Sequence, residues 1–141
     1  MTPGRHVLTI VACGAGPAAA IGICIKLAQD CGWTVQVIAT PAALDFFDAA
    51  AIADQTGSLV RSQYVKPGAP RSLIPDAILV APATYNTINK WAHGISDNYA
   101  LGVLARPPAS ASRPSYCPSS TPPWPIGPRS AAASSPCAPK A

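Results

Sequence analysis

Charged residues are scarce in this chain, and no acidic residue follows Asp97. Charged residues make up 11% of the 141 residues, whereas 49% are hydrophobic. So low a charge content is expected where helices cover both faces of a sheet. The net charge of +4 comes from four basic residues after residue 104, because the preceding part holds six acidic and six basic residues. This scattered basic tail is not a basic face with aromatic side chains, so we expect no nucleic-acid partner.

Paired cysteines are also lacking. The five cysteines form no CxxC motif and their number is odd, which speaks against both a disulfide framework and a zinc site. Cys13, Cys24 and Cys31 lie in apolar contexts, so we expect them to be small core residues of a protein in the reducing cytoplasm. The sequence predicts no metal site.

Long uninterrupted apolar runs are absent. The run from Val7 to Ala12 is shorter than the apolar core of a usual signal peptide, and Gly14, Gly16 and Pro17 interrupt its continuation to Ile25. We therefore expect neither export nor a membrane span, and we expect a cytoplasmic protein.

Leucine, valine, phenylalanine and acidic residues are all missing after residue 104. Residues 105–141 hold 10 Pro, 8 Ser and 8 Ala. Prolines at this density exclude strands, and the apolar surface is too small to offset the entropy of ordering the chain. We expect a domain over 1–104 that is incomplete at its C-terminal side, followed by a disordered Pro/Ser/Ala-rich tail. A second interpretation is that a shifted reading frame in a GC-rich gene encodes residues 105–141.

The first 104 residues show an alternation of strand and helix patterns. Apolar runs predict strands at 7–13, 33–39 and 76–81 and a short one at 58–60, and helical patterns cover 17–31, 42–53, 85–92 and 97–104. This alternation predicts right-handed βαβ units and hence an α/β fold with a parallel sheet.

A glycine turn follows the first predicted strand. The stretch from Gly14 to Ala19, GAGPAA, fits the dinucleotide-binding pattern G-x-G-x-x-G/A between a strand and a helix. The turn amides and the start of the helix would hold a phosphate. An NAD-binding domain has Asp or Glu at the end of the second strand, whereas this chain has Thr40. The threonine therefore favours a mononucleotide over a dinucleotide as the ligand. The alternative is that the glycine turn binds no ligand and serves packing only.

Polar side chains follow the strand at 76–81. Thr84, Asn86 and Thr87 come directly after an Ala-Pro-Ala segment and open a predicted helix. Ligands of open α/β sheets bind outside the carboxyl ends of the strands. Asparagine offers both a donor and an acceptor, which suits a flavin ring edge or a substrate carboxylate. The alternative is that these residues only cap the helix, for which one polar residue would suffice.

Residues 81–104, APATYNTINKWAHGISDNYALGVL, resemble the PASANT region of the flavin-containing cysteine decarboxylases, and GISDN at 94–98 resembles the family's second conserved patch. This family includes phosphopantothenoylcysteine decarboxylases and enzymes that oxidatively decarboxylate the C-terminal cysteine of peptides. With the glycine turn and Thr40, the resemblance covers about residues 5–104. It implies a flavodoxin-like, doubly wound parallel sheet in three layers, α/β/α.

The resemblance also implies an FMN cofactor and a set of site residues. Asn86 matches the asparagine that positions the substrate carboxylate during catalysis. The implied FMN-binding residues are Gly14, Gly16 and Thr40 at the phosphate and ribityl chain, and Ala81, Pro82, Ala83 and Thr84 along the isoalloxazine ring. In the family mechanism FMN takes electrons from the cysteine, and the resulting thioaldehyde loses carbon dioxide.

The chain departs from the family at the catalytic histidine. The family has this histidine shortly before the PASANT strand, but residues 64–75 hold none, and neither His6 nor His93 matches its position. Tyr85 replaces a small residue of the motif, and the family's C-terminal substrate-binding segment has no counterpart. The absence of a base at this place would remove acid–base assistance worth about 10²–10⁴-fold in rate.

Three functions stay open. The first is an FMN-dependent decarboxylase that acts on a cysteine-containing small molecule or a peptidyl cysteine. The second is a flavoprotein that holds FMN without turnover, and the third is an NAD(P)-binding fragment. The resemblance further implies a homo-oligomer built from trimers with FMN at the subunit interfaces.

Overall fold

The computed structural model describes residues 6–106 and 115–118 of the chain. Three strands, β1 (Val7–Ala12), β2 (Thr34–Ala39) and β3 (Ala77–Ala83), form a parallel sheet with a fourth, β4 (Ser115–Pro118). The strand order is β2-β1-β3-β4, the order of flavodoxin-like doubly wound sheets. The predicted fold class is confirmed.

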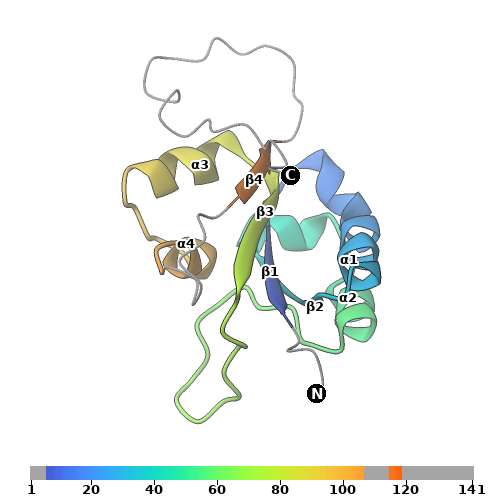
Figure 1. Cartoon of the computed structure of the whole chain (residues 1–141). Helices are drawn as coiled ribbons and strands as arrows, with labels where there is room; N and C mark the ends of the chain where they lie inside the picture. The colour runs from blue at the N-terminus through green and yellow to red at the C-terminus, as the bar shows by residue number, and fades with distance from the viewer. Residues whose placement is uncertain (1–5, 107–114, 119–141) are drawn as a thin grey trace.

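Helices cover both faces of this sheet. Figure 1 shows α1 (Ile21–Asp30) and α2 (Ala49–Thr56) on one side, and α3 (Tyr85–Ala92) and α4 (Tyr99–Leu104) on the other. The alternation of side chains along each strand divides the apolar residues between two cores. Ile10 and Ala12 of β1 face α1 and α2, whereas Val11 and Cys13 face α3 and α4.

Two predicted helices are shorter than their patterns and begin with separate 3-10 turns. The helix expected at 17–31 consists of η1 (Gly16–Ala20) and α1, and the helix expected at 42–53 consists of η2 (Pro41–Asp45) and α2. The second break lies at Asp48, whose carboxylate accepts a hydrogen bond from the amide of Ala50 at 2.9 Å and so caps α2. Gly57 ends α2 with a positive φ of 71°, a conformation that glycine adopts without strain.

The short strand expected at 58–60 is not an element of the sheet. The chain instead forms one parallel bridge at the edge of β2, between Ile38 and Arg61. The amide of Arg61 donates to the carbonyl of Val37, and the amide of Ala39 donates to the carbonyl of Arg61. The irregular loop 62–75 follows and leads to β3.

One expectation about the tail is wrong. Its proline content predicted no strand within 105–141, yet Ser115–Pro118 pairs in parallel with β3. Proline is tolerated here because β4 is the edge strand and Pro118 is its last residue. The rest of the predicted tail, from residue 107 to 114 and from 119 on, lies outside the described residues.

No helix within the described ranges is long and apolar enough to cross a membrane.

Candidate functional site

The segments that follow β1, β2 and β3 lie together at one edge of the sheet. Because β1 pairs with both β2 and β3 in parallel, the carboxyl ends of all three strands meet there. Two backbone hydrogen bonds continue the pairing beyond the ladder. The amide of Cys13 donates to the carbonyl of Pro82 at 3.0 Å, and the amide of Thr40 donates to the carbonyl of Ala12 at 2.9 Å. The structure thus brings the three predicted segments of the site together.

Gly14 lies where the turn after β1 contacts the turn after β2. A Cβ atom at Gly14 would be 2.7 Å from the Cβ of Ala42, a separation that no pair of carbon atoms tolerates. A residue without a side chain is therefore needed for packing at this position. At Gly14, this finding supports the alternative in which the glycine is needed for packing.

Gly16 differs from Gly14 in its surroundings. A Cβ atom at Gly16 would meet no described atom within 4 Å, and its φ is not among the positive values found at four other glycines. Neither packing nor backbone conformation requires glycine here. Glycine at this turn would also allow another molecule to approach the backbone closely.

Thr40 follows β2 and opens η2. Thr40 is 6% exposed, and its side chain makes no capping hydrogen bond to the first turn of η2. Its backbone is held by the bond from its amide to Ala12 and by the bond that its carbonyl accepts from Ala43 at 2.9 Å. These bonds hold the backbone of Thr40 at the strand-end edge of the sheet.

The Ala-Pro-Ala segment forms the end of β3. Ala81 is half-buried, and both Pro82 and Ala83 are buried. The peptide bond between Ala81 and Pro82 is cis. Of these three residues, Ala81 presents the most surface.

Thr84 and Thr87 form hydrogen bonds with each other. The Thr84 hydroxyl accepts a hydrogen bond from the amide of Thr87 at 3.3 Å and lies 3.0 Å from the Thr87 hydroxyl. Thr87 is itself buried. This is the N-cap of α3. Two of the three polar residues that the sequence singled out therefore stabilise the start of a helix.

Asn86 is the polar residue of the motif that remains available. It is exposed in the first turn of α3, and the described residues offer its side chain no hydrogen bond. Tyr85 beside it is also exposed. A carboxamide at this place can donate to and accept from a ligand at the sheet edge.

Neither histidine of the chain lies in the loop before β3. His6 precedes β1, at the end of the sheet opposite to the site, where its ring lies 5.6 Å from that of Trp33. His93 caps the C-terminus of α3 and is exposed. Within the described residues, no group of three His, Cys, Asp or Glu side chains could hold a metal ion.

The second resembling patch, 94–98, connects α3 to α4. Asn98 caps α4 by accepting a hydrogen bond from the amide of Leu101 at 2.9 Å. Asp97 forms an ion pair with Lys90 in the last turn of α3. The patch thus fixes the two helices relative to each other, a role that its sequence alone did not predict.

Arg61 is a neighbour of the candidate site that the sequence analysis did not identify. Arg61 lies in register with Ile38, and its backbone bonds to Ala39, the residue directly before Thr40. The sequence signal was weak because Arg61 lies in a segment without strand periodicity.

Comparisons with known proteins agree with this geometry. The model of the family described as Flavoprotein matches residues 1–118. The match extends beyond the 5–104 covered by the resemblance and includes β4. The comparison with curated protein sequences finds no match.

Solved structures with similar folds include FMN-dependent cysteine decarboxylases. SpaF is 25% identical, with a TM-score of 0.64 over 82% of this chain and 68% of SpaF. TvaF, from thioviridamide biosynthesis, is 24% identical, with a TM-score of 0.69 over 84% of this chain and 76% of TvaF. A variant of EpiD in complex with the substrate peptide DSYTC is 23% identical, with a TM-score of 0.64 over 82% of this chain and 66% of EpiD.

The family match covers most of the chain. The chain belongs to the Flavoprotein family.

Proposed function

We propose that this flavoprotein binds FMN at the carboxyl ends of β1, β2 and β3 and oxidatively decarboxylates a cysteine-containing substrate. The observation that supports this most is the convergence of the glycine turn, Thr40 and the start of α3 at one sheet edge. Family membership favours flavin over the NAD(P) alternative. The threonine at the end of β2 agrees, since a dinucleotide site would have an acid there.

The residues present at this edge fit the FMN phosphate and ribityl chain. Gly16 is exposed, and no described atom lies near the position of its missing Cβ, so a ligand can approach the backbone there. Thr40 has a hydroxyl without a capping role, and it can donate to a phosphate or ribityl oxygen. Gly14 allows the two turns to approach each other. The end of β3, from Ala81 to Thr84, would border the flavin ring.

Asn86 would position the substrate. Its exposed carboxamide lies in the first turn of α3, on the same edge as the proposed FMN site. The amide NH₂ can donate to the substrate carboxylate and hold it while the C–C bond breaks. We assign Asn86 the catalytic role for this reason.

The chemistry divides between cofactor and protein. When bound, FMN supplies the capacity to accept the two electrons removed from the cysteine side chain, after which the carboxylate leaves as carbon dioxide. The chain contributes the orientation of the substrate through Asn86 and a closely packed floor of Pro82 and Ala83.

A second function, FMN binding without turnover, is favoured by the loop before β3. Residues 62–75 hold no histidine, and His6 lies at the opposite end of the sheet. Bound flavin with an unchanged substrate would support this alternative.

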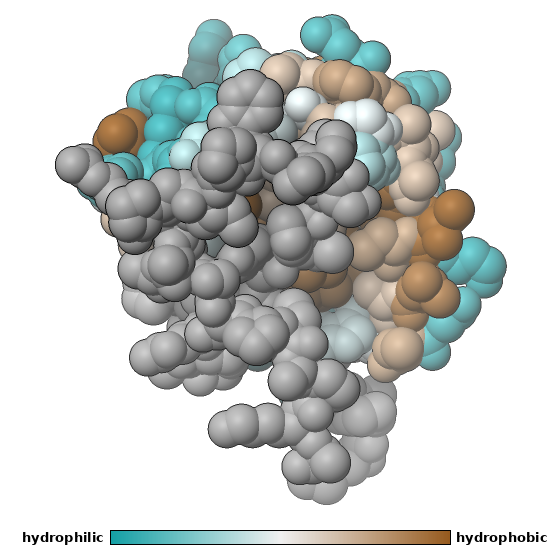
Figure 2. All heavy atoms as spheres, turned by 90° about the horizontal axis from the view of Figure 1, so that it is seen from above, coloured by the Kyte–Doolittle hydropathy of each residue, from teal (hydrophilic) through white to brown (hydrophobic). Residues whose placement is uncertain are grey.

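We further propose that the protein assembles as a homo-oligomer. Ile23 and Leu27 are 67% and 62% exposed on the outer face of α1, and Figure 2 shows apolar surface on the flank where the helices of this side lie. Burial of such side chains between copies would stabilise an assembly. Light scattering coupled to size-exclusion chromatography measures its mass, and a monomer would contradict the proposal.

The decisive experiment combines a spectrum with mass spectrometry. The purified protein is expected to show visible flavin absorbance and to release FMN on denaturation. Incubation with DSYTC, the peptide bound to EpiD, is expected to remove carbon dioxide and two hydrogen atoms from the peptide. DSYTS is the matched control and is expected to stay intact. Phosphopantothenoylcysteine is tested in parallel as the small-molecule substrate.

Each outcome has a distinct meaning. Absence of flavin even after addition of FMN would refute the proposed site. Bound FMN with an intact peptide and an intact small molecule would establish the alternative without turnover.

A further inference from the structure

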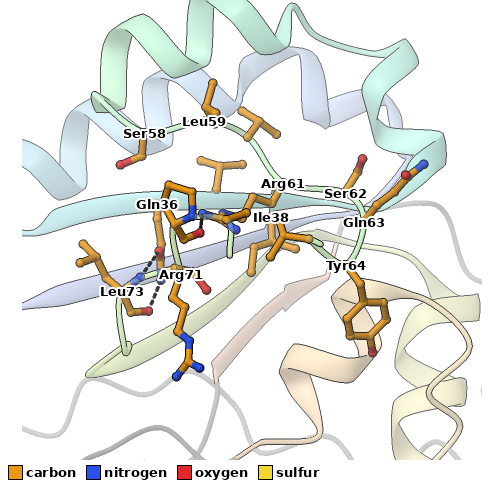
Figure 3. A pocket seen from close by; sticks show the side chains of 16 residues that line it. Gln36, Ile38, Ser58, Leu59, Arg61, Ser62, Gln63, Tyr64, Arg71 and Leu73 are labelled. Carbon is orange, nitrogen blue, oxygen red and sulfur yellow. Dashed lines mark hydrogen bonds between the residues drawn. The ribbon is translucent and has the colours of Figure 1, made fainter. Parts of the chain in front are cut away.

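Two adjoining cavities lie under the loop between α2 and β3, beside the edge of β2. The first has a volume of about 610 Å³ and lies against residues 36–38 of β2. The second, of about 420 Å³, extends from the same loop to α4 and Arg106. Arg61, Arg71 and Tyr64 line both cavities, and Figure 3 shows the first of them with the loop closing over β2.

The walls of these cavities are held by specific contacts. Gln36, which is buried, donates to the carbonyl of Leu73 at 2.8 Å and accepts from its amide at 3.1 Å, so it binds the loop to β2. Figure 3 shows this pair of bonds. At the other side, the Tyr64 ring packs edge-on against Tyr99 of α4, with centroids 5.1 Å apart. Gly102 makes room for it, because a Cβ atom there would overlap the Tyr64 hydroxyl.

The lining is positively charged. The second cavity is bordered by Arg61, Arg71 and Arg106, and no Asp or Glu lines either cavity. Residues 55–75 hold three basic residues and no acidic one. Within the described ranges, the ion pairs formed by basic residues involve His6 and two lysines but no arginine. The loop thus concentrates positive charge, and in the described part of the chain none of its arginines forms an ion pair.

Arg61 has a hydrogen-bonding group without a partner. One guanidinium nitrogen, Nη2, donates to the carbonyl of Pro70. The other, Nη1, is buried and has no hydrogen-bond partner among the described residues. A buried donor of this kind costs free energy unless an acceptor reaches it. In Figure 3 the Arg61 side chain points back under the loop, whereas Arg71 extends away from the loop.

We propose that these adjoining cavities form a binding site for an organic oxyanion, a carboxylate or a phosphate monoester, with a short apolar body. Arg71 would bind the oxyanion through two parallel hydrogen bonds, the pairing that a guanidinium group favours. Arg61, whose Nη2 is already bonded to Pro70, would donate to the same oxyanion through Nη1 from the buried side. Apolar lining residues such as Ile38, Ile78 and Val103 accommodate the body of the ligand. None of the residues assigned to the FMN site lines either cavity.

The site is tested by a ¹H–¹⁵N NMR titration of the full chain with inorganic phosphate and, separately, with butyrate, both at constant ionic strength. Saturable shifts are expected at the amides of Arg61, Arg71 and Leu73. Arg71→Gln is expected to weaken binding about tenfold or more, because it removes a charge-assisted hydrogen bond. Arg71 is exposed, so this variant is expected to fold, and its unperturbed spectrum confirms that it does.

Lys66→Gln is the matched control. It removes the same charge from the same exposed loop, but Lys66 lines neither cavity, so a change in affinity of less than twofold is expected. Equal weakening by the two variants would show that the anions are attracted nonspecifically by the charge of the loop, and it would overturn the proposal. So would the absence of saturable shifts with both anions. Tighter binding of butyrate than of phosphate would show that the oxyanion of the ligand is a carboxylate. The reverse order would show that it is a phosphate group.

Discussion

A Cβ atom placed on Gly14 would lie 2.7 Å from the Cβ of Ala42, so the turn after β1 and the turn after β2 are in direct contact. This contact positions Thr40, which lies between β2 and the turn that contains Ala42. The proposed phosphate end of the FMN site therefore depends on the packing of two loops that are 28 residues apart in sequence, as the positions 14 and 42 show.

Replacement of Gly14 by alanine is expected to destabilise the protein. The added methyl group forces the two turns apart, and such overpacking costs about 1–3 kcal/mol. Urea unfolding measures the loss. FMN affinity is expected to fall as well, because Thr40 moves with the turn. Gly16→Ala is the matched control for folding: its methyl group meets no described atom, so its unfolding midpoint is expected to stay unchanged while its FMN affinity falls. Unchanged FMN affinity in Gly16→Ala would contradict the placement of FMN at this turn.

Thr84→Ala is expected to lower the free energy of unfolding by about 1 kcal/mol, because the helix loses its N-cap. Thr84→Ser keeps the hydroxyl that accepts from the amide of Thr87, so it is expected to retain most of the stability. Thermal unfolding in the absence of added FMN separates this structural effect from flavin binding. Equal stability of Thr84→Ala and the parent protein would show that the cap contributes nothing.

Asn86→Ala is expected to leave both folding and flavin content unchanged, since the exposed carboxamide makes no hydrogen bond to the described residues. If the protein turns over substrate, kcat/KM is expected to fall about 10- to 100-fold, the effect of losing a hydrogen bond to a charged group. Asn89→Ala on the same helix serves as the control and is expected to retain activity. A decarboxylation rate in Asn86→Ala equal to that of the parent would remove Asn86 from the catalytic site.

Gln36→Leu is expected to loosen the loop before β3. The substitution leaves the amide and carbonyl of Leu73 without the partners that Gln36 provides, at a cost of about 1–3 kcal/mol. Trypsin cleavage after Arg71 is expected to accelerate, as measured by mass spectrometry of the digest. Gln55→Leu is the control, since Gln55 binds the carbonyl of Gly22 on the exposed surface and its loss is expected to change stability by less than about 0.5 kcal/mol. Equal cleavage rates in both variants would contradict this role of Gln36.

The sequence predicted the elements with strong periodicity and the edge at which they meet. The strands from Val7, Thr34 and Ala77 lie within a residue or two of their expected bounds, because apolar runs bounded by glycine and proline are typical of buried parallel strands. The segment at 58–60 was less predictable, since a single bridge to Ile38 replaces a strand there. The pairing of Ser115–Pro118 was missed because proline-rich composition is read as unpaired chain, whereas an edge position tolerates it.

The sequence by itself determined the parallel sheet and the resemblance to the flavoprotein family, and it predicted a candidate site at the strand ends, because periodicity and short motifs are local properties of the chain. Only the tertiary structure assigned the individual side chains. It showed that Gly14 is required by Ala42 and that Gly16 is not required by packing. It also showed that Thr84 and Thr87 bond to each other while Asn86 stays exposed. These distinctions depend on contacts between residues and on the direction of each side chain, and neither is encoded in the spacing of residue types along the chain.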